Sequence, residues 1–180
     1  FTVVLLLDRS DSVAPIINDL KKAAISFVEQ LRPNDRAVGI AFDRKAYILN
    51  TKVRDRETLK TSIQNMTTGA GTHLHSTIEG IINRIFRGLK GRKALIVFTD
   101  GQEAWNWDQP KGAIPQFTAE TNIKAAEETG TQIYSIQSDS NFRSKEGDKF
   151  MKEIPLKTGG MYFRADKLKD FNKVFGLISY

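Results

Sequence analysis

The sequence predicts an α/β domain in which a mostly parallel central sheet is covered by helices on both faces. Strand-like apolar runs alternate with amphipathic helical stretches along the 180 residues, an order that favours parallel strands joined by right-handed crossovers. The runs at residues 3–7 and 94–98 contain no polar residue, as expected of strands buried on both faces. No internal repeat or low-complexity segment divides the chain, so we expect one domain over residues 1–180.

The first half of the chain is predicted to supply three strands and three helices. Apolar residues recur at three- and four-residue steps over residues 13–31, which gives one apolar stripe on a helix of about five turns. A second stripe with the same spacing covers residues 74–86. The predicted elements are a buried strand at 3–7, a helix over 13–31, a strand at 37–42, an edge strand near 47–49, a short helix over 56–65 and a helix over 74–86.

The second half continues the alternation and ends on a helix. Gly130 is expected to stop one helix, because glycine readily adopts the left-handed conformation found just after helix ends. The predicted elements are a strand at 94–98, a helix over 120–128, a strand at 132–137, a short helix near 148–153, a short strand at 161–163 and a closing helix over 168–178. The whole pattern predicts a Rossmann-like fold with the strands at 3–7 and 94–98 adjacent at the centre of the sheet.

The composition is that of a folded globular domain. Hydrophobic residues make up 40% of the chain and charged residues 27%. No apolar run approaches the roughly 18–20 residues that a membrane span needs. Cysteine is absent, which excludes disulfides and thiol chemistry but does not fix the compartment. Because the chain begins within a predicted strand and has no initiator Met, we expect it to be a module cut from a longer protein.

The net charge of +6 and the pI near 9.5 raise the question of a nucleic-acid partner. The basic residues are scattered through predicted helices that also carry acids, and no basic block contains interleaved aromatic residues. We therefore interpret the charge as solvated helix faces and expect no nucleic-acid binding. An acidic protein partner or an anionic surface is the alternative.

A polar run, D-R-S-D-S at residues 8–12, comes directly after the first predicted strand. In open α/β sheets, ligands bind at the carboxyl ends of the strands. One carboxylate and two hydroxyls at alternate positions of a tight turn can converge, and oxygen ligands suit a hard cation such as Mg²⁺. A Gly-rich loop at 69–72 and the end of the strand at 94–98 add two more oxygen ligands. The candidate metal ligands are Asp8, Ser10, Ser12, Thr72 and Asp100.

Each of these residues also has a purely structural interpretation. An Asp after a strand often bonds nearby backbone N–H groups. Ser10 and Ser12 are also candidate caps for the helix that follows. The combination of five oxygen ligands from three segments, with no Cys or His among them, nevertheless favours a metal site.

These motifs together resemble the von Willebrand factor A domain with a complete metal-ion-dependent adhesion site. The family pattern is D-x-S-x-S, then a Thr after a Gly-rich turn, then an Asp at the end of the central strand, often within T-D-G. All five positions match in that order, including T-D-G at 99–101, and residues 33–42 are similar to the family's second-strand region. The resemblance covers nearly the whole chain.

The resemblance implies a protein-binding module for adhesion or assembly, not an enzyme. The hydroxyls of Ser10, Ser12 and Thr72 would bind the cation directly, and Asp8 and Asp100 would lie in or just behind its first shell, often through water. The ion would stay electrophilic and keep one position open for a Glu or Asp of a partner protein. Mg²⁺ is the expected ion, with Mn²⁺ and Ca²⁺ as alternatives.

Five residues are candidates for contacting the partner. Arg9 and Asp11 occupy positions where the family usually has small or apolar residues, and we expect both to face solvent, with a modified specificity as the alternative. The resemblance also suggests that Asp11 could fill the open coordination position itself. His73 and His75 flank Thr72, and we expect one on the rim and the other capping or packing. The irregular segment 102–118 should border the metal. Its Trp105 and Trp107 are expected to be either binding hot spots or core anchors. The candidates for contacting the partner are therefore Arg9, Asp11, His73, Trp105 and Trp107.

The alternative function is a metal-dependent phosphoryl-transfer or hydrolase domain on the same architecture. Haloacid-dehalogenase-type phosphatases require Asp-x-Asp after the first strand, whereas this chain has Ser10 at the second position. No P-loop, G-x-G-x-x-G or Ser–His–acid arrangement is present either. A third interpretation is a scaffold with a structural site. Because vertebrate adhesion domains of this family usually carry disulfides, the cysteine-free chain indicates a bacterial protein, for which we expect an extracytoplasmic location.

Overall fold

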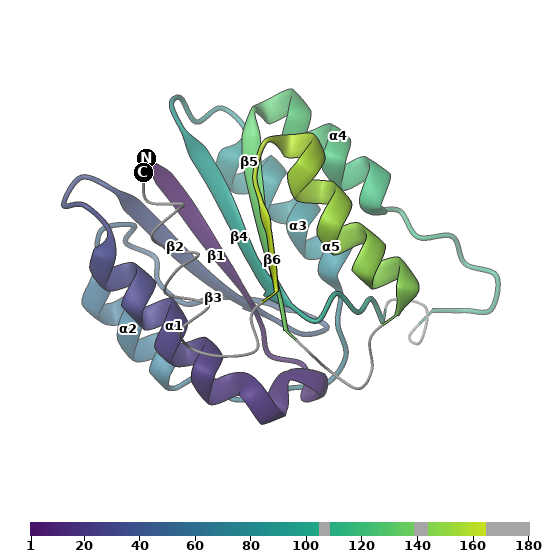
Figure 1. Ribbon diagram of the computed structural model, residues 1–180, viewed down its shortest axis with the longest axis horizontal. Helices are drawn as coiled ribbons and strands as arrows, with labels where there is room; N and C mark the ends of the chain where they lie inside the picture. The colour runs from purple at the N-terminus through teal and green to yellow at the C-terminus, as the bar shows by residue number, and fades with distance from the viewer. Residues whose placement is uncertain (105–108, 139–143, 165–180) are drawn as a thin grey trace.

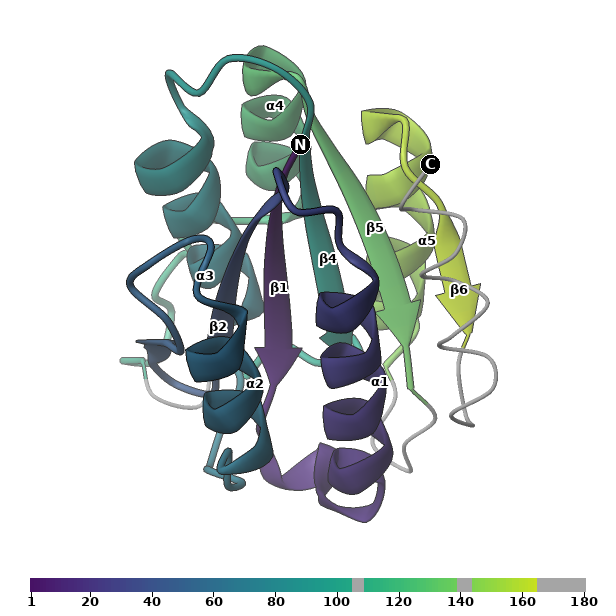
Figure 2. The same cartoon turned by 90° about the vertical axis from the view of Figure 1, so that its left-hand side faces the viewer.

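The computed structural model describes residues 1–104, 109–138 and 144–164 and contains a twisted six-stranded sheet between two layers of helices (Figures 1 and 2). The strand order is β3-β2-β1-β4-β5-β6, and only β3 is antiparallel to its neighbour. The strands are β1 (Thr2–Asp8), β2 (Arg36–Phe42), β3 (Ala46–Ile48), β4 (Lys93–Thr99), β5 (Thr131–Gln137) and β6 (Tyr162–Arg164).

The helices divide between the two faces of the sheet. Helices α1 and α2 cover one face, and α3, α4 and α5 cover the other (Figures 1 and 2). The helical segments are the 3₁₀ segment η1 (Asp11–Ile16), α1 (Ile17–Gln30), α2 (Arg56–Gln64), α3 (Leu74–Ile81), the π-helical turn η2 (Ile82–Phe86), α4 (Ala119–Thr129) and α5 (Lys145–Thr158).

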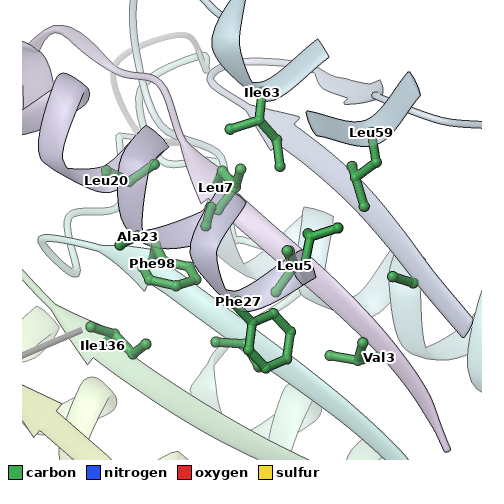
Figure 3. Packing of buried hydrophobic residues seen from close by; sticks show 14 of the residues in the cluster. Val3, Leu5, Leu7, Leu20, Ala23, Phe27, Leu59, Ile63, Phe98 and Ile136 are labelled. Atoms are coloured by element: carbon green, nitrogen blue, oxygen red, sulfur yellow. The ribbon is translucent and has the colours of Figure 1, made fainter. Parts of the chain in front are cut away.

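Strand β1 is buried along its whole length because both of its faces are covered. Alternate side chains of a strand point to opposite faces, so Leu5 packs toward Phe27 and Leu59 on the α1/α2 side (Figure 3). Leu6 packs instead with the cluster on the α3/α4/α5 side. This two-sided packing fixes the carboxyl end of β1, where the polar run begins.

The fold and the central position of β1 and β4 confirm the prediction. The two strands pair in parallel, with Leu7 opposite Phe98. The helix predicted over 13–31 begins as a 3₁₀ segment, and regular α-helix starts only at Ile17. Pro15 accounts for this difference, because proline lacks a backbone donor and disfavours the α conformation of the preceding residue.

Helix α5 is longer than the short helix predicted near 148–153. Pro155 argues against a helix in the sequence, but it is accommodated near the helix end. The hydroxyl of Ser144 accepts a hydrogen bond from the Gly147 N–H and caps the first turn, while Phe150 and Ile154 are buried against the sheet. Capping and burial therefore outweigh the local signals.

Several predicted features fall outside the described residues. They are Trp105, Trp107 and the closing helix over 168–178. Among the helices that the structure does describe, none has both the length and the apolar character needed to cross a membrane.

Candidate metal centre

The candidate ligands come from three loops at the end of the sheet where the parallel strands have their carboxyl ends. The arrowheads of β1, β4 and β5 point to this end (Figure 2). Strand β1 ends at Asp8, and β4 ends at Thr99, directly before Asp100. The Thr99 hydroxyl donates to Asp8 Oδ2 at 2.5 Å, which ties the two strand ends together.

The D-R-S-D-S run forms a tight turn that is closed by the first carboxylate. Asp8 is fully buried, and its Oδ1 accepts a hydrogen bond from the Ser10 N–H at 2.8 Å. The Ser10 and Ser12 hydroxyls lie 3.0 Å apart. Ser10 precedes η1 but makes no side-chain capping bond, so its hydroxyl is directed toward Ser12 and not toward the helix end. The two hydroxyls therefore converge, as the spacing predicts.

The loop that carries Thr72 is tied to both neighbouring loops through its backbone. The Gly69 N–H donates to the Arg9 carbonyl at 2.7 Å, beside a short parallel bridge between Ser10 and Gly69. The Ala104 N–H donates to the Thr72 carbonyl at 2.7 Å. Backbone hydrogen bonds thus hold the three loops together within the protein itself.

Asp100 is buried at the end of β4. Its Oδ1 accepts from the Gln102 N–H at 3.0 Å, and its carbonyl accepts from Gln137 Nε2 at 3.1 Å. Gly101 follows with a φ of +87°, a conformation that a residue with a Cβ adopts only under strain. The glycine of T-D-G therefore lets the chain turn sharply while the Asp100 side chain stays at the strand end.

The hydroxyl-bearing residues Ser10, Ser12 and Thr72 line one open cavity of about 300 Å³ at the carboxyl end of the sheet. Asp8 and Asp100 do not line it and are both almost fully buried. The arrangement therefore places the hydroxyls at the surface of the site and the carboxylates within the protein. The cavity is lined by Ser10, Asp11, Ser12, Gly71, Thr72, Gln102 and Ala104.

Burial raises the pKa of Asp8 from its ordinary 3.8 to about 7. The charge of Asp100 adds to this rise, while hydrogen bonds from Ser10 and Thr99 oppose it. A carboxylate taken out of water needs a compensating charge, and a cation next to it would supply one. Two acids with three hydroxyls form an all-oxygen donor set, which fits a hard cation. In the described part of the chain no three His, Cys, Asp or Glu side chains are grouped so that they could hold a metal ion, so an ion at this site would need the hydroxyls as well as the two acids.

Arg9 does not face solvent, contrary to prediction. Its side chain is only 19% exposed and forms an ion pair with Asp43 at 3.4 Å. Arg9 Nη2 donates to the Thr68 carbonyl at 3.1 Å, and the guanidinium lies 4.9 Å from the centre of the Tyr47 ring. Asp43 at the end of β2 and Tyr47 on β3 attract the Arg9 guanidinium, so it lies against them and not in solvent. Asp11, in contrast, is exposed, as expected, and it lines the cavity that Ser10, Ser12 and Thr72 share.

The two histidines have different surroundings. The His73 N–H donates to the Asp43 carbonyl at 2.9 Å, and its own carbonyl accepts from Thr77 Oγ1 at 2.6 Å, so its backbone begins α3. The His75 ring forms a hydrogen bond of 2.9 Å with Asn122 Oδ1. Its centre lies 4.6 Å from that of the Phe150 ring, with the two rings nearly perpendicular, so His75 has a packing role. Both side chains also line a larger cavity of about 740 Å³ beside the metal loops.

Sequence reasoning did not identify two residues that organise the site. The Thr99 hydroxyl donates to Asp8 and accepts from the Gly101 N–H at 3.1 Å, so it links the turn after Asp8 to the turn at Asp100 and Gly101. Asp43 anchors Arg9 through its side chain and His73 through its carbonyl. Asp43 directly follows an apolar strand, which is the same signal that identified Asp8.

A mostly parallel sheet covered by helices on both faces, with polar side chains gathered at the ends of its central strands, defines a Rossmann-like α/β domain. The family model for the von Willebrand factor type A domain matches residues 2–176, and the chain belongs to this family. Domains of this family generally mediate protein interactions.

The relatives with similar sequences are bacterial. A UPF0353 protein of Mycobacterium avium is 27% identical over 98% of this chain and 59% of that protein. A UPF0353 protein of Mycolicibacterium gilvum is 26% identical over 96% of this chain and 58% of that protein. The chain therefore spans less than two thirds of the length of these relatives.

Several solved structures share the fold. The conserved hypothetical protein BatB from Bacteroides thetaiotaomicron aligns with a TM-score of 0.72 and 21% identity over 99% of this chain and 97% of that one. A von Willebrand factor type A structure from Catenulispora acidiphila gives a TM-score of 0.76 and 14% identity over 99% and 41%. An aerotolerance-related membrane protein from Bacteroides fragilis gives 0.67 and 21% over 98% of each chain.

Proposed function

We propose that this domain binds a partner protein through a divalent cation, physiologically Mg²⁺, and that the partner supplies a Glu or Asp carboxylate. The observation that carries the proposal is one open cavity lined by three candidate hydroxyl ligands and backed by two buried acids. This arrangement supports a metal-ion-dependent adhesion site as the proposed site. The proposed ligands are Asp8, Ser10, Ser12, Thr72 and Asp100.

Some residues of the site would bind the ion, and others would hold the ligands in position. Neutral hydroxyls of Ser10, Ser12 and Thr72 would hold the ion while donating little negative charge to it. Asp8 is oriented by the Ser10 N–H and by Thr99, so its carboxylate is fixed before a ligand arrives. The cation, when bound, supplies a Lewis acid that attracts a carboxylate oxygen.

Asp11 would shape the choice of partner. It is exposed on the wall of the same cavity and adds a negative charge beside the entry path. A partner with one isolated carboxylate is therefore favoured over a densely acidic one, because like charges in close approach lower affinity. A phosphatase of the Asp-x-Asp type needs a second Asp two residues after the first, and this chain has Ser10 there. Asp11 is the one acid among the described residues that line the cavity, so an enzymatic role is the weaker candidate.

We also propose that the domain acts outside the cytoplasm. One protein with the same fold is described as an aerotolerance-related membrane protein. A parent protein at the cell envelope would present the metal face to partners in the same compartment. Protease protection of the full-length protein in intact cells tests the location; complete protection with or without outer-membrane permeabilisation contradicts it.

Calorimetry with Mg²⁺, Mn²⁺ and Ca²⁺ tests the metal site, and an acidic peptide library tests ligand capture. Millimolar Mg²⁺ should raise the melting temperature, EDTA should reverse the rise, and Asp8→Ala should abolish it while the domain stays folded. Glu127→Ala is the matched control, because Glu127 is an exposed acid on α4 outside the site. Absence of heat from all three ions at millimolar concentration, with or without an acidic ligand, would contradict the proposal.

A further inference from the structure

A groove of about 360 Å³ lies between the edge strand β3 and helix α3, and it shares no lining residue with the cavity of Ser10, Ser12 and Thr72. None of the candidate metal ligands lines it. The residues around it come from β2, β3, α3, η2 and the turn that joins β2 to β3. They are Ile40, Arg44, Lys45, Ala46, Ile48, Ser76, Thr77, Gly80, Ile81, Arg84 and Ile85.

The base of the groove is apolar. Ile40 and Ile81 are 3% exposed and belong to the core on the α3 side of the sheet. Ile48 stands opposite Ile40 in the strand pair but is 65% exposed, because no described element covers it. Ile48 is therefore a large apolar side chain that is exposed to water next to the buried core on the α3 side.

Within the described part of the chain, no strand pairs with the outer side of β3. In its pairing with β2, the Asp43 N–H donates to the Lys45 carbonyl at 3.0 Å and the Leu49 N–H donates to the Gly39 carbonyl at 2.8 Å. Inward and outward bonding alternates along an antiparallel strand, so the N–H and C=O groups of Ala46 and Ile48 face away from β2. β3 is the last strand on that side of the described sheet. The edge is therefore available to one more strand.

The rim of the groove is positively charged. Its charged lining residues within the described chain are Arg44, Lys45 and Arg84, with no acid among them. A cationic edge repels the same edge of a second copy, which is how many proteins prevent edge-to-edge association. The same charges attract an acidic strand, so complementarity selects a different and acidic partner.

We propose that the β3 edge and this groove dock an extended acidic segment of a partner protein, which adds as a further strand beside β3. Its backbone would pair with Ala46 and Ile48. Alternate side chains of the added strand would face the groove, and among these the apolar ones would cover Ile48 and the base of the groove while the acidic ones would meet Lys45 and Arg84. This surface contains none of the candidate metal ligands and needs no cation, so it would be a second contact site of the domain.

Fluorescence anisotropy in EDTA tests this proposal, because chelation removes the metal site from the measurement. The probe is a short labelled peptide in which every second residue, the set that would face the groove, is valine at the centre and glutamate at both ends, with serine at the positions between. Lys45→Glu/Arg84→Glu should weaken its binding by about tenfold or more, since two attractive charges become repulsive. Lys22→Glu/Lys157→Glu changes the net charge equally at exposed sites on other helices and should bind as the wild type does.

Two further peptides separate the contributions of charge and backbone. A peptide with lysine in place of glutamate should not bind, and a peptide N-methylated at alternate amides should lose binding although its charge is unchanged. The Ala46 and Ile48 amides should exchange more slowly with solvent in the complex. The proposal is overturned by no binding of the glutamate peptide at millimolar concentration, by equal losses in the two double variants, or by undiminished binding of the N-methylated peptide.

Discussion

The buried Asp8 carboxyl group should make the stability of the metal-free domain depend on pH. Its pKa rises from 3.8 in the unfolded chain to about 7 in the folded one, which corresponds to about 4 kcal/mol at 1.36 kcal/mol per pH unit. A raised carboxyl pKa means that the folded state holds the proton more tightly, so stability is full below pH 3.8 and falls as pH rises toward 7. Between pH 5 and pH 8, this one group should remove about 2.6 kcal/mol from the free energy of unfolding.

Urea denaturation in EDTA at pH 5, 6, 7 and 8 measures this loss against Asp8→Asn. The Asn side chain keeps the size of Asp and does not titrate, so the free energy of unfolding of the wild type should fall more steeply than that of the variant. All other ionisable groups are the same in both proteins, so their contributions cancel in the difference. Parallel curves for the two proteins over this range would refute the reasoning. With the wild type, Mg²⁺ affinity should fall up to about tenfold for each pH unit below 7, because binding must then displace the proton.

Three substitutions test how the site is held. Arg9→Met removes the ion pair with Asp43 and should weaken Mg²⁺ affinity several-fold in calorimetry, with far-UV circular dichroism unchanged. Thr99→Val removes the donor to Asp8 and should lower the free energy of unfolding by about 1–3 kcal/mol in urea at pH 8; an unchanged midpoint would contradict it. Gly69→Ala would place a Cβ against Asp43 Oδ2, so both its melting temperature and its Mg²⁺ affinity should fall.

The sequence was sufficient where one local pattern determined the structure. Strands β1 and β4 are buried on both faces, so they appear as unbroken apolar runs, and the carboxylates that follow them are placed by the strand ends. The convergence of Ser10 and Ser12 also depends only on a short turn. Thr72 is different, because its separation from the first loop carries no local signal, and only its Gly-rich setting and the family pattern pointed to it.

Arg9 shows why the rest was not predictable. Its direction is decided by Asp43 and Tyr47, which approach it only after β2 and β3 have paired beside β1. Nothing in the D-R-S-D-S run distinguishes a solvated guanidinium from one held by a neighbouring strand end. The extent of α5 depended on tertiary context in the same way, since burial of Phe150 and Ile154 outweighed the unfavourable Pro155.

The contacts of Arg9 change how its departure from the family pattern should be understood. Its carbonyl accepts the Gly69 N–H, while its side chain reaches Thr68 and Asp43. Asp43 in turn accepts the His73 N–H through its carbonyl, so the chain is held on both sides of Thr72. A small or apolar residue at position 9 would keep the backbone bond but lose the side-chain contacts. The arginine therefore adds a second set of ties between the first loop and the Thr72 loop, and it does so without placing its positive charge in the cavity where a cation would bind.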